Sequence, residues 1–316
     1  MQAPTIQEIR TAASRLKPYI HRTPVFTSIS LNRLCGAEIF LKCENLQKVG
    51  AFKIRGATNA VFSLTAEEAA RGVATHSSGN HAAALAQAAS WRGIKAYCVM
   101  PENAPDVKRR AVAGYGAEIT LCQSNLQARE AGLQAVVDRT GATVVHGYND
   151  LRVITGQATA GLELCEDVQR LDFVIAPVGG GGLISGTAIA VNAISPTTRV
   201  IAAEPELADD AYRSFLAGHI IPLTHTDTIA DGLRTSLGEL TFPIIQKYVS
   251  QVITVSEEAI ITAMRIIWER TKLLVEPSGA VPLAAVLSNY DVFAGKRVGL
   301  ILSGGNVDLD HLPWMK

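Results

Sequence analysis

Residues 173–186 read FVIAPVGGGGLISG, and the order of elements in this stretch decides the fold. The apolar run Phe173 to Ala176 predicts a buried strand, and the run Ile184 to Asn192 predicts a helix. Four successive glycines stand between them. A strand that enters a helix through such a short turn is the repeating unit of an α/β fold, in which helices cover a sheet of mainly parallel strands.

The same alternation continues along the rest of the chain, where short apolar runs are followed by segments of helical period. Further strands are expected at Glu38 to Lys42, Gly72 to Thr75, Ala96 to Met100, Glu118 to Leu121, Val144 to His146, Arg199 to Ala203 and Val298 to Leu302. Further helices are expected at Ala57 to Ser63, Ala82 to Ser90, Ala104 to Gly114, Gln127 to Arg139, Gly156 to Glu166, Glu257 to Thr271 and Ala280 to Ser288. The pattern therefore predicts an α/β fold with mainly parallel sheets.

The glycine tract also indicates a binding site. Gly179 to Gly182 have no Cβ atoms, so several backbone amides can converge on one phosphate at the positive end of the following helix. A flexible linker is the alternative, but linkers usually carry serine or charge on both flanks, whereas this tract lies between a buried strand and a helix. Its spacing does not match the dinucleotide-binding pattern GxGxxG.

A lysine with apolar neighbours lies in the stretch AFKIRGA, residues 51–57. An amine in a partly dry pocket loses solvation of its charged state, so its pKa falls and the neutral form can make a Schiff base with a carbonyl. A lysine whose ammonium group simply reaches water is the commoner outcome for such a stretch taken alone. Lys53 is therefore a candidate covalent anchor that other motifs have to support.

Two polar turns at the ends of expected strands support it. The turn Ser77-Ser78-Gly79-Asn80-His81 opens a helix, where backbone N–H groups and the helix N-terminus suit an anion such as a substrate carboxylate. An ordinary helix cap made by Ser77 or Ser78 is the alternative. Ser303 follows the last strand beside two glycines, at the sheet edge where ligands of open parallel sheets bind.

The composition is that of a globular enzyme rather than a nucleic-acid or membrane protein. The chain has 316 residues, of which 48% are hydrophobic and 18% charged, and its net charge is zero, so it can bury a substantial core in one or two domains. Its five cysteines are scattered without a CxxC pair, which favours reduced thiols in a cytoplasm. There is no basic-then-apolar leader and no apolar run of about 20 residues, so neither export nor a membrane span is expected.

Together the motifs resemble the fold type II pyridoxal-phosphate enzymes, and within them the group of serine racemases and serine/threonine dehydratases. The resemblance spans nearly the whole chain, because several independent motifs occur in the right order. They are KCENLQ (42–47), AFKIRGA (51–57), THSSGNH (75–81), GGGG (179–182), AEP (203–205), IADG (229–232), EP (276–277) and LSGGNVDL (302–309).

This resemblance implies a fold like that of the tryptophan synthase β subunit, with two three-layer αβα lobes. Residues 1–68 and 150–316 would form a large domain that binds pyridoxal 5′-phosphate, and residues 69–149 a small inserted domain. The cofactor would lie in the cleft between them, which can close on substrate and exclude water. A homodimer also follows from the resemblance.

The resemblance also assigns roles to individual residues. Lys53 would bind the cofactor covalently and then act as the base that removes the Cα proton, and Ser78 could work from the opposite face of that carbon in a racemase. The cofactor would be held by Phe52, Lys53, Asn80, Gly179, Gly180, Gly181, Gly182, Leu183 and Ser303. The substrate would be bound by Ser77, Ser78, Gly79, Asn80, His81 and Arg129.

The expected reaction follows from the partner of the pyridine nitrogen. A serine hydroxyl at Ser303 is a neutral partner and leaves that nitrogen largely unprotonated, which favours loss of a β-leaving group over routes that need a long-lived carbanion. We expect dehydration and deamination of L-serine or L-threonine to a 2-oxo acid and ammonia, with serine racemisation as a possible shared activity. The alternative is a 3-hydroxyaspartate dehydratase, in which Arg129 and Arg152 would together grip the second carboxylate.

A divalent cation, Mg²⁺ or else Ca²⁺ or Mn²⁺, is also implied near the cofactor phosphate. Its ligands would be Glu204, the carbonyl of Ala208 and Asp210, which are hard oxygen donors. An acidic helix N-terminus is the plain alternative. The sequence departs from the family at Ala82-Ala83 and in the stretch HGYND (146–150), which lacks the frequent proline after the histidine. These departures put a nucleotide effector in doubt.

Two other classes of protein remain to be compared with this interpretation. A nicotinamide oxidoreductase would use the glycine tract but has no need of Lys53 or Ser303. A carrier or regulator that holds vitamin B6 without catalysis would keep Lys53 and the glycines but does not need the turn at residues 77–81.

Overall fold

The computed structural model describes residues 2–315 except 78, 105 and 225, and its strands form two sheets. The larger sheet has the strand order β1-β2-β10-β7-β8-β9, and all its neighbours pair in parallel except β1 and β2. Its strands are β1 (Val25–Phe26), β2 (Glu38–Cys43), β10 (Arg297–Leu302), β7 (Phe173–Pro177), β8 (Arg199–Pro205) and β9 (Gln251–Val255).

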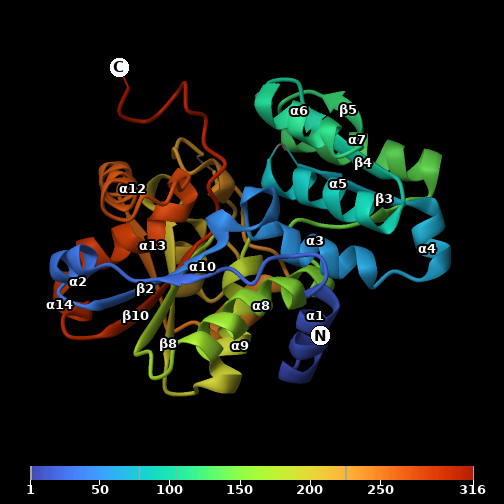
Figure 1. The fold of residues 1–316 in the computed structure, drawn as a ribbon. Coiled ribbons are helices and arrows are strands. Elements are labelled where there is room, and N and C mark those ends of the chain that lie inside the picture. Colours follow the sequence, from blue (N-terminus) through green and yellow to red (C-terminus); the bar gives the residue numbers. More distant parts are fainter. Residues whose placement is uncertain (1, 78, 105, 225, 316) are drawn as a thin grey trace.

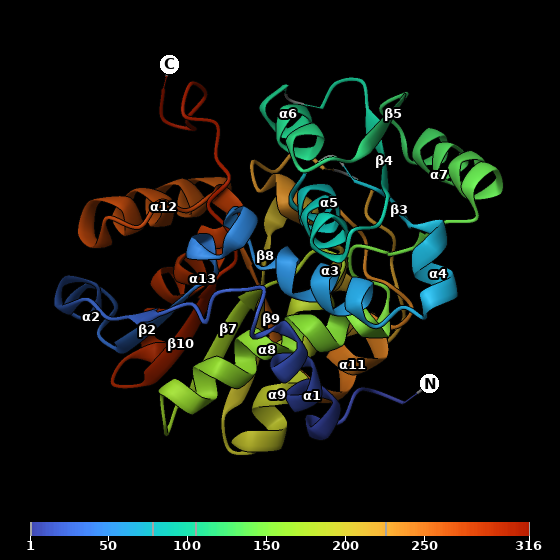
Figure 2. The same cartoon turned by 45° about the vertical axis from the view of Figure 1, so that its right-hand side comes forward.

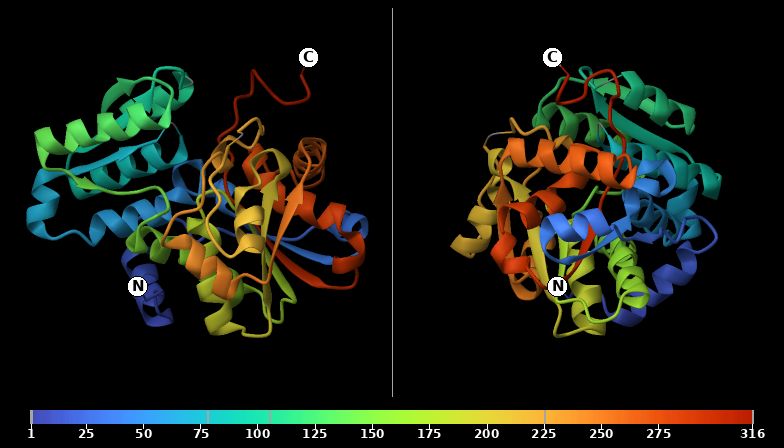
Figure 3. Two further views of the ribbon diagram at one scale, coloured as in Figure 1. Left: turned by 180° about the vertical axis from the view of Figure 1, so that it is seen from behind. Right: turned by 60° about the vertical axis from the view of Figure 1, so that its left-hand side comes forward.

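The smaller sheet is parallel throughout and has the order β5-β4-β3-β6. Its strands are β5 (Glu118–Cys122), β4 (Ala96–Pro101), β3 (Val73–His76) and β6 (Thr143–Val144). Figures 1 and 3 show this sheet and its helices as a group set apart from the strands of the larger sheet. The α/β fold with mainly parallel sheets is confirmed. The domain boundaries near residues 69 and 149 stay a prediction.

Helices cover both faces of the larger sheet because its strands are apolar on both sides. In β7, Phe173 and Ile175 pack into one core, and Val174 and Ala176 pack into another on the opposite face. The first core contains α2 (Ile29–Cys35), α12 (Glu257–Thr271), α13 (Pro277–Ser288) and α14 (Tyr290–Phe293). The second contains α8 (Leu151–Asp167), α9 (Gly182–Ile194), α10 (Asp210–Ala217) and α11 (Thr241–Tyr248).

The smaller sheet is built in the same way. Ala74, Tyr97 and Val99 pack against the helix α7 (Leu126–Thr140), and Cys98 and Met100 pack on the opposite face. That second face is covered by α5 (Asn80–Arg92) and α6 (Asp106–Gly114). The helices α3 (Lys53–Phe62), α4 (Ala66–Arg71) and α8 adjoin α5, and α1 (Ile6–Leu16) lies beside α8, as Figure 2 shows.

Two contacts join the two sheets. A buried ion network links Arg55 of α3 to Glu44 of the short helix η1 (Glu44–Leu46) and to Glu163 of α8, which also binds Lys42 of β2. On the surface, Lys108 of α6 pairs with Asp231 of the short helix η4 (Asp231–Leu233). Among the described residues, no helix is long and apolar enough to cross a bilayer.

Candidate active site

The carboxyl ends of several strands carry the polar turns that the sequence singled out. Ser77 follows β3, Gly179 follows β7 and Ser303 follows β10. Ala51 forms an isolated bridge with Gly304, and the Phe52 amide donates to the Ser303 carbonyl at 3.0 Å. These contacts hold the start of α3, and therefore Lys53, beside the end of the last strand.

Lys53 is the first residue of α3 and is partly buried. Its Nζ donates to the Gly147 carbonyl at 2.7 Å and lies 5.1 Å from the centre of the Phe52 ring. Burial lowers the pKa of Lys53 to about 8, while the charge of Glu276 acts in the opposite direction. A substantial neutral fraction is therefore available near neutral pH, as a nucleophile or base requires.

The glycine turn is closely packed by the protein on its Cβ side. A Cβ at Gly181 would lie 2.7 Å from Thr241, and one at Gly179 would lie 3.0 Å from the Leu233 Cα. Cβ atoms at Gly180 and Gly182 would meet Tyr148. Gly181 has φ +92°, which strains any other residue. Larger residues are thus excluded, and the functional groups left at the turn are the first amides of the 13-residue helix α9.

Leu183 belongs to the same helix end and is 4% exposed. Tyr148 is the residue after Gly147, so two neighbouring residues of the chain reach from the Lys53 amine to the glycine turn. The short distance along the chain between these contacts places an amine close to an anion-binding helix end. The arrangement suits a cofactor that carries both an aldehyde and a phosphate.

The turn at residues 77–81 begins α5, with Gly79 at the cap. Ser77 Oγ accepts from the Gly79 amide at 3.3 Å. His81 is 3% exposed and its Nε2 donates to the Val145 carbonyl at 2.9 Å, so its side chain faces the interior and what it offers an anion is its backbone amide. Burial and then Lys53 lower the pKa of His81 to about 3. Ser78 lies outside the described residues.

Asn80 belongs to a polar cluster at the end of the last strand. Its Nδ2 donates to Glu276 Oε1 at 2.9 Å, and its Oδ1 accepts from Asn306 Nδ2 at 2.9 Å. Glu276 is 3% exposed, and burial followed by the charge of Asp231 raises its pKa to about 8. It lies against Gly304, the residue after Ser303. Sequence reasoning missed Glu276 as a site residue, although its position before Pro277 at a helix start was visible.

Arg129 and Arg152 do not converge as expected. Arg152 pairs with Asp150 at 2.8 Å, so its charge is already matched. Arg129 has a single long hydrogen bond, 3.4 Å from its Nε to the Asn125 carbonyl, and no described carboxylate lies within ion-pair distance of it. Its charge, after burial, lowers the pKa of His76, which places Arg129 near the carboxyl end of β3.

The expected cation ligands form a buried acidic pair. Glu204 accepts from the Ala211 and Tyr212 amides at 3.0 and 2.9 Å, and Asp210 Oδ2 accepts from the Leu237 amide at 3.0 Å. The Oδ1 atom of Asp210 is buried without a partner among the described residues. Burial raises the pKa of Asp210 to about 7, and burial with the charge of Asp210 raises that of Glu204.

These two carboxylates and the Ala208 carbonyl are oxygen donors of the kind that Mg²⁺ and Ca²⁺ prefer. The described residues contain no group of three or more His, Cys, Asp or Glu side chains that could hold a metal. The expected site therefore depends on a backbone carbonyl as its third protein ligand.

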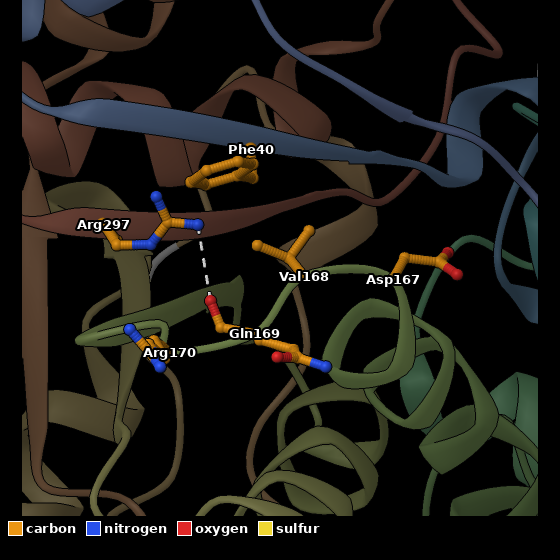
Figure 4. Close-up of a pocket in the computed structure, with 6 residues that line it drawn as sticks. All are labelled: Phe40, Asp167, Val168, Gln169, Arg170 and Arg297. Carbon is orange, nitrogen blue, oxygen red and sulfur yellow. Dashed lines mark hydrogen bonds between the residues drawn. The ribbon is translucent and has the colours of Figure 1, made fainter.

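One surface pocket lies away from all these residues. Figure 4 shows this pocket, of about 480 Å³, where Arg297 stacks on Phe40 and donates to the Gln169 carbonyl at 3.4 Å. Arg297 begins β10, whereas Ser303 follows its other end. The pocket is thus at the opposite edge of the sheet from Lys53.

Comparison with known proteins settles the family. A family model described as pyridoxal-phosphate dependent enzyme matches residues 16–304. The chain belongs to the family of pyridoxal-phosphate dependent enzymes. It is 54% identical to the beta-hydroxyaspartate dehydratase of Paracoccus denitrificans (strain Pd 1222), over 99% of this chain and 100% of that protein.

Solved structures of the same family agree with this fold. The serine racemase of Dictyostelium discoideum superposes with a TM-score of 0.93 at 50% identity, over 96% of this chain and 99% of that one. A bacterial-type comparison is the threonine deaminase of T.th., which superposes with a TM-score of 0.92 at 46% identity, over 97% and 99%. The pyridoxal-phosphate dependent enzymes of this group are hydroxy amino acid dehydratases and racemases, so neither a nicotinamide oxidoreductase nor a carrier without catalysis describes this chain.

Proposed function

We propose that this enzyme removes water and ammonia from a β-hydroxy amino acid, L-serine or L-threonine, and leaves a 2-oxo acid. The observation that carries the proposal is the amine of Lys53, whose pKa burial lowers to about 8, held at the carboxyl edge of the sheets by Gly147. Pyridoxal phosphate, when bound, supplies an electron sink for negative charge at the substrate Cα.

The residues of the chain divide the remaining work. Lys53 is the covalent anchor and the base that takes the Cα proton. The amides of Gly179 to Gly182 and Leu183 bind the phosphate at the positive end of α9. Phe52 and Asn80 flank the ring, and Ser303 offers its nitrogen a neutral hydroxyl. The amides of residues 77–81 bind the substrate carboxylate at the start of α5.

Removal of the amine tests the anchor. Lys53→Ala should abolish the visible band of the purified protein that borohydride bleaches, and lower kcat by roughly 10² to 10⁴. Lys53→Arg is the matched variant, because it keeps the positive charge but cannot form the imine. Turnover by Lys53→Ala at the parental rate would refute the proposal.

A second candidate substrate is 3-hydroxyaspartate. Arg129 favours it, because its guanidinium has no carboxylate partner among the described residues and lies near His76. The relative from Paracoccus denitrificans, named a beta-hydroxyaspartate dehydratase, supports the same choice. A bidentate arginine is suited to the second carboxylate of such a substrate.

A substrate panel separates the two candidates. Both enantiomers of serine and threonine and the isomers of 3-hydroxyaspartate are scored for ammonia, 2-oxo acid and inverted amino acid. Arg129→Gln should lower kcat/KM for 3-hydroxyaspartate by roughly tenfold to a hundredfold more than for serine if the second candidate is right. Arg139→Gln, at the far end of α7, is the control. An equal effect on both substrates would favour serine or threonine.

Three further features belong to the proposal. Serine racemisation is expected as a shared activity through Ser78, and Ser78→Ala should remove it while leaving more of the elimination. A divalent cation bound by Glu204, Ala208 and Asp210 is supported by the partnerless Oδ1 atom of Asp210. A cytoplasmic homodimer is supported by the resemblance and by five cysteines that form no disulfide.

A further inference from the structure

His146 lies just beyond β6, where its ring accepts two backbone hydrogen bonds. The amides of Tyr148 and Asn149 donate to its Nδ1 at 3.3 and 3.0 Å. A backbone N–H can only donate, so Nδ1 must offer a lone pair. The neutral ring therefore carries its proton on Nε2, and a proton on Nδ1 would break both bonds.

The surroundings keep this ring neutral. Burial, then the nearby His76 ring, then Lys53 lower the pKa of His146 to about 4, and only Asp150 acts in the opposite direction. The centres of the His76 and His146 rings are 6.1 Å apart, and the Tyr148 ring meets His146 edge-on at 4.5 Å. The acceptor state of Nδ1 is therefore stable over the whole range in which enzymes of this kind work.

The three residues after His146, which we call the 147–149 segment, contact three different parts of the site. The Gly147 carbonyl accepts from Lys53 Nζ at 2.7 Å. Tyr148 lies against Gly180 and Gly182, where a Cβ would meet it. Asn149 Oδ1 accepts from the Leu240 amide at 2.8 Å, in the loop whose Thr241 binds the Gly180 carbonyl at 2.7 Å.

We propose that His146 is a positioning residue, whose Nδ1 holds the 147–149 segment so that Gly147 aims the Lys53 amine and Tyr148 closes the glycine turn. The proposal rests on the proposed function in one respect, because it takes Lys53 as the reactive amine. His146 acts through Gly147 and Tyr148. The two bonds at Nδ1 fix the backbone of both residues at once.

The Gly147 carbonyl gives Lys53 a defined orientation. An amine that donates one N–H to a carbonyl turns its lone pair to another side, where it can accept a proton. If the 147–149 segment loosens, the carbonyl moves away and the amine can rotate. An error of about 1 Å in such a position can lower a rate by roughly a hundredfold.

A matched set of substitutions separates the two ring nitrogens. In His146→Asn the side-chain oxygen can replace Nδ1 as the acceptor, whereas in His146→Gln the amide reaches the position of Nε2, and His146→Leu removes both. We expect His146→Asn to keep kcat within about threefold, while the other two lose roughly thirtyfold or more, with KM for the amino acid changed less than kcat.

Two measurements do not depend on activity. In ¹⁵N NMR spectra of the apoprotein at neutral pH, Nδ1 of His146 should have the shift of an unprotonated nitrogen and Nε2 that of a protonated one, with the signals assigned by their loss in His146→Asn. The dissociation constant of pyridoxal phosphate, followed by its fluorescence, should rise at least about tenfold in His146→Gln and His146→Leu but not in His146→Asn.

Three results would overturn the proposal. One is an Nδ1-protonated ring in the apoprotein, and another is a His146→Asn variant as impaired as His146→Leu, which would make Nε2 the important atom. The third is parental kcat and cofactor affinity in all the variants. If His146→Leu does not fold, His146→Gln carries the test. Inactivity of the parent toward every β-hydroxy amino acid would count against the proposed substrates, while the NMR and cofactor measurements would still decide the role of His146.

Discussion

Burial is the main influence on the ionisable residues around Lys53. It lowers the pKa of Lys53 to about 8 and that of His146 to about 4, and it raises that of Glu276 to about 8. Each shift favours the neutral form of its group. The cleft therefore holds fewer charges at neutral pH than the sequence suggests.

The shift of Lys53 can be measured directly in the apoprotein. Its acylation rate, followed by mass spectrometry of its peptide, should rise with a midpoint near pH 8 instead of 10.5. Between these values the unfolded chain binds more protons than the folded one, so the contribution of Lys53 to stability increases with pH. The exposed Lys247 serves as the reference. A midpoint near 10 for Lys53 would show that its amine is well solvated.

The acidic pair Glu204 and Asp210 gives a prediction of opposite sign. The folded-state pKa of Asp210 is raised to about 7, so between about pH 4 and 7 this group loses stability as pH rises. A bound cation should cancel that loss, and the increase in Tm on adding Mg²⁺ or Ca²⁺ should be larger at pH 8 than at pH 6. Asp210→Asn should remove most of the increase. An increase that is equal at both pH values and survives Asp210→Asn would exclude this pair as ligands.

Single elements differ from the sequence prediction where a tertiary contact or a cap sets their ends. The helix expected from Ala57 begins at Lys53, because the bridge between Ala51 and Gly304 fixes the chain just before it. The helix expected from Gly156 begins at Leu151, where Asp150 accepts from the Arg152 amide. Asp150 is a common capping residue and could have been recognised. The strands β1 and β9 were missed because each is short and depends on a neighbour for its hydrogen bonds.

The glycine turn gives a prediction at the scale of the element. Gly180→Ala should cost roughly 1 to 3 kcal/mol of unfolding free energy and weaken cofactor binding, because its Cβ would meet the Tyr148 ring. Gly114→Ala is the control, since nothing lies within 4 Å of a Cβ there and the residue is helical. Denaturant unfolding and cofactor titration measure the two effects. Equal behaviour of the two variants would mean that the turn yields easily.

The whole molecule is held together by a charged cluster that the sequence did not reveal. Arg55, Lys42 and Glu44 are completely buried, Glu163 is 8% exposed, and the four come from two strand or loop segments and two helices. Lys53, the glycine turn and Ser303 could be recognised from local motifs. Glu276, His146 and the Arg55 cluster could not, because their roles arise from residues that are distant in sequence.

Disruption of the cluster should be costly. Arg55→Met leaves Glu44 and Glu163 buried without their partner, and we expect a loss of roughly 3 to 5 kcal/mol in unfolding free energy. Arg22 also pairs with two carboxylates, Glu166 and Asp167, but on the surface, so Arg22→Met should cost about 1 kcal/mol or less. Denaturant melts of both variants make the comparison. Similar midpoints would show that the buried cluster is dispensable.

The ion pair between Lys108 and Asp231 has a consequence for how small molecules come and go. Its side chains are 22% and 41% exposed, so dissolved ions can compete with each partner. Concentrated salt would loosen this strap while leaving the dry Arg55 cluster intact. Traffic into and out of the catalytic chamber would then quicken in brine, at no expense to the framework that surrounds it.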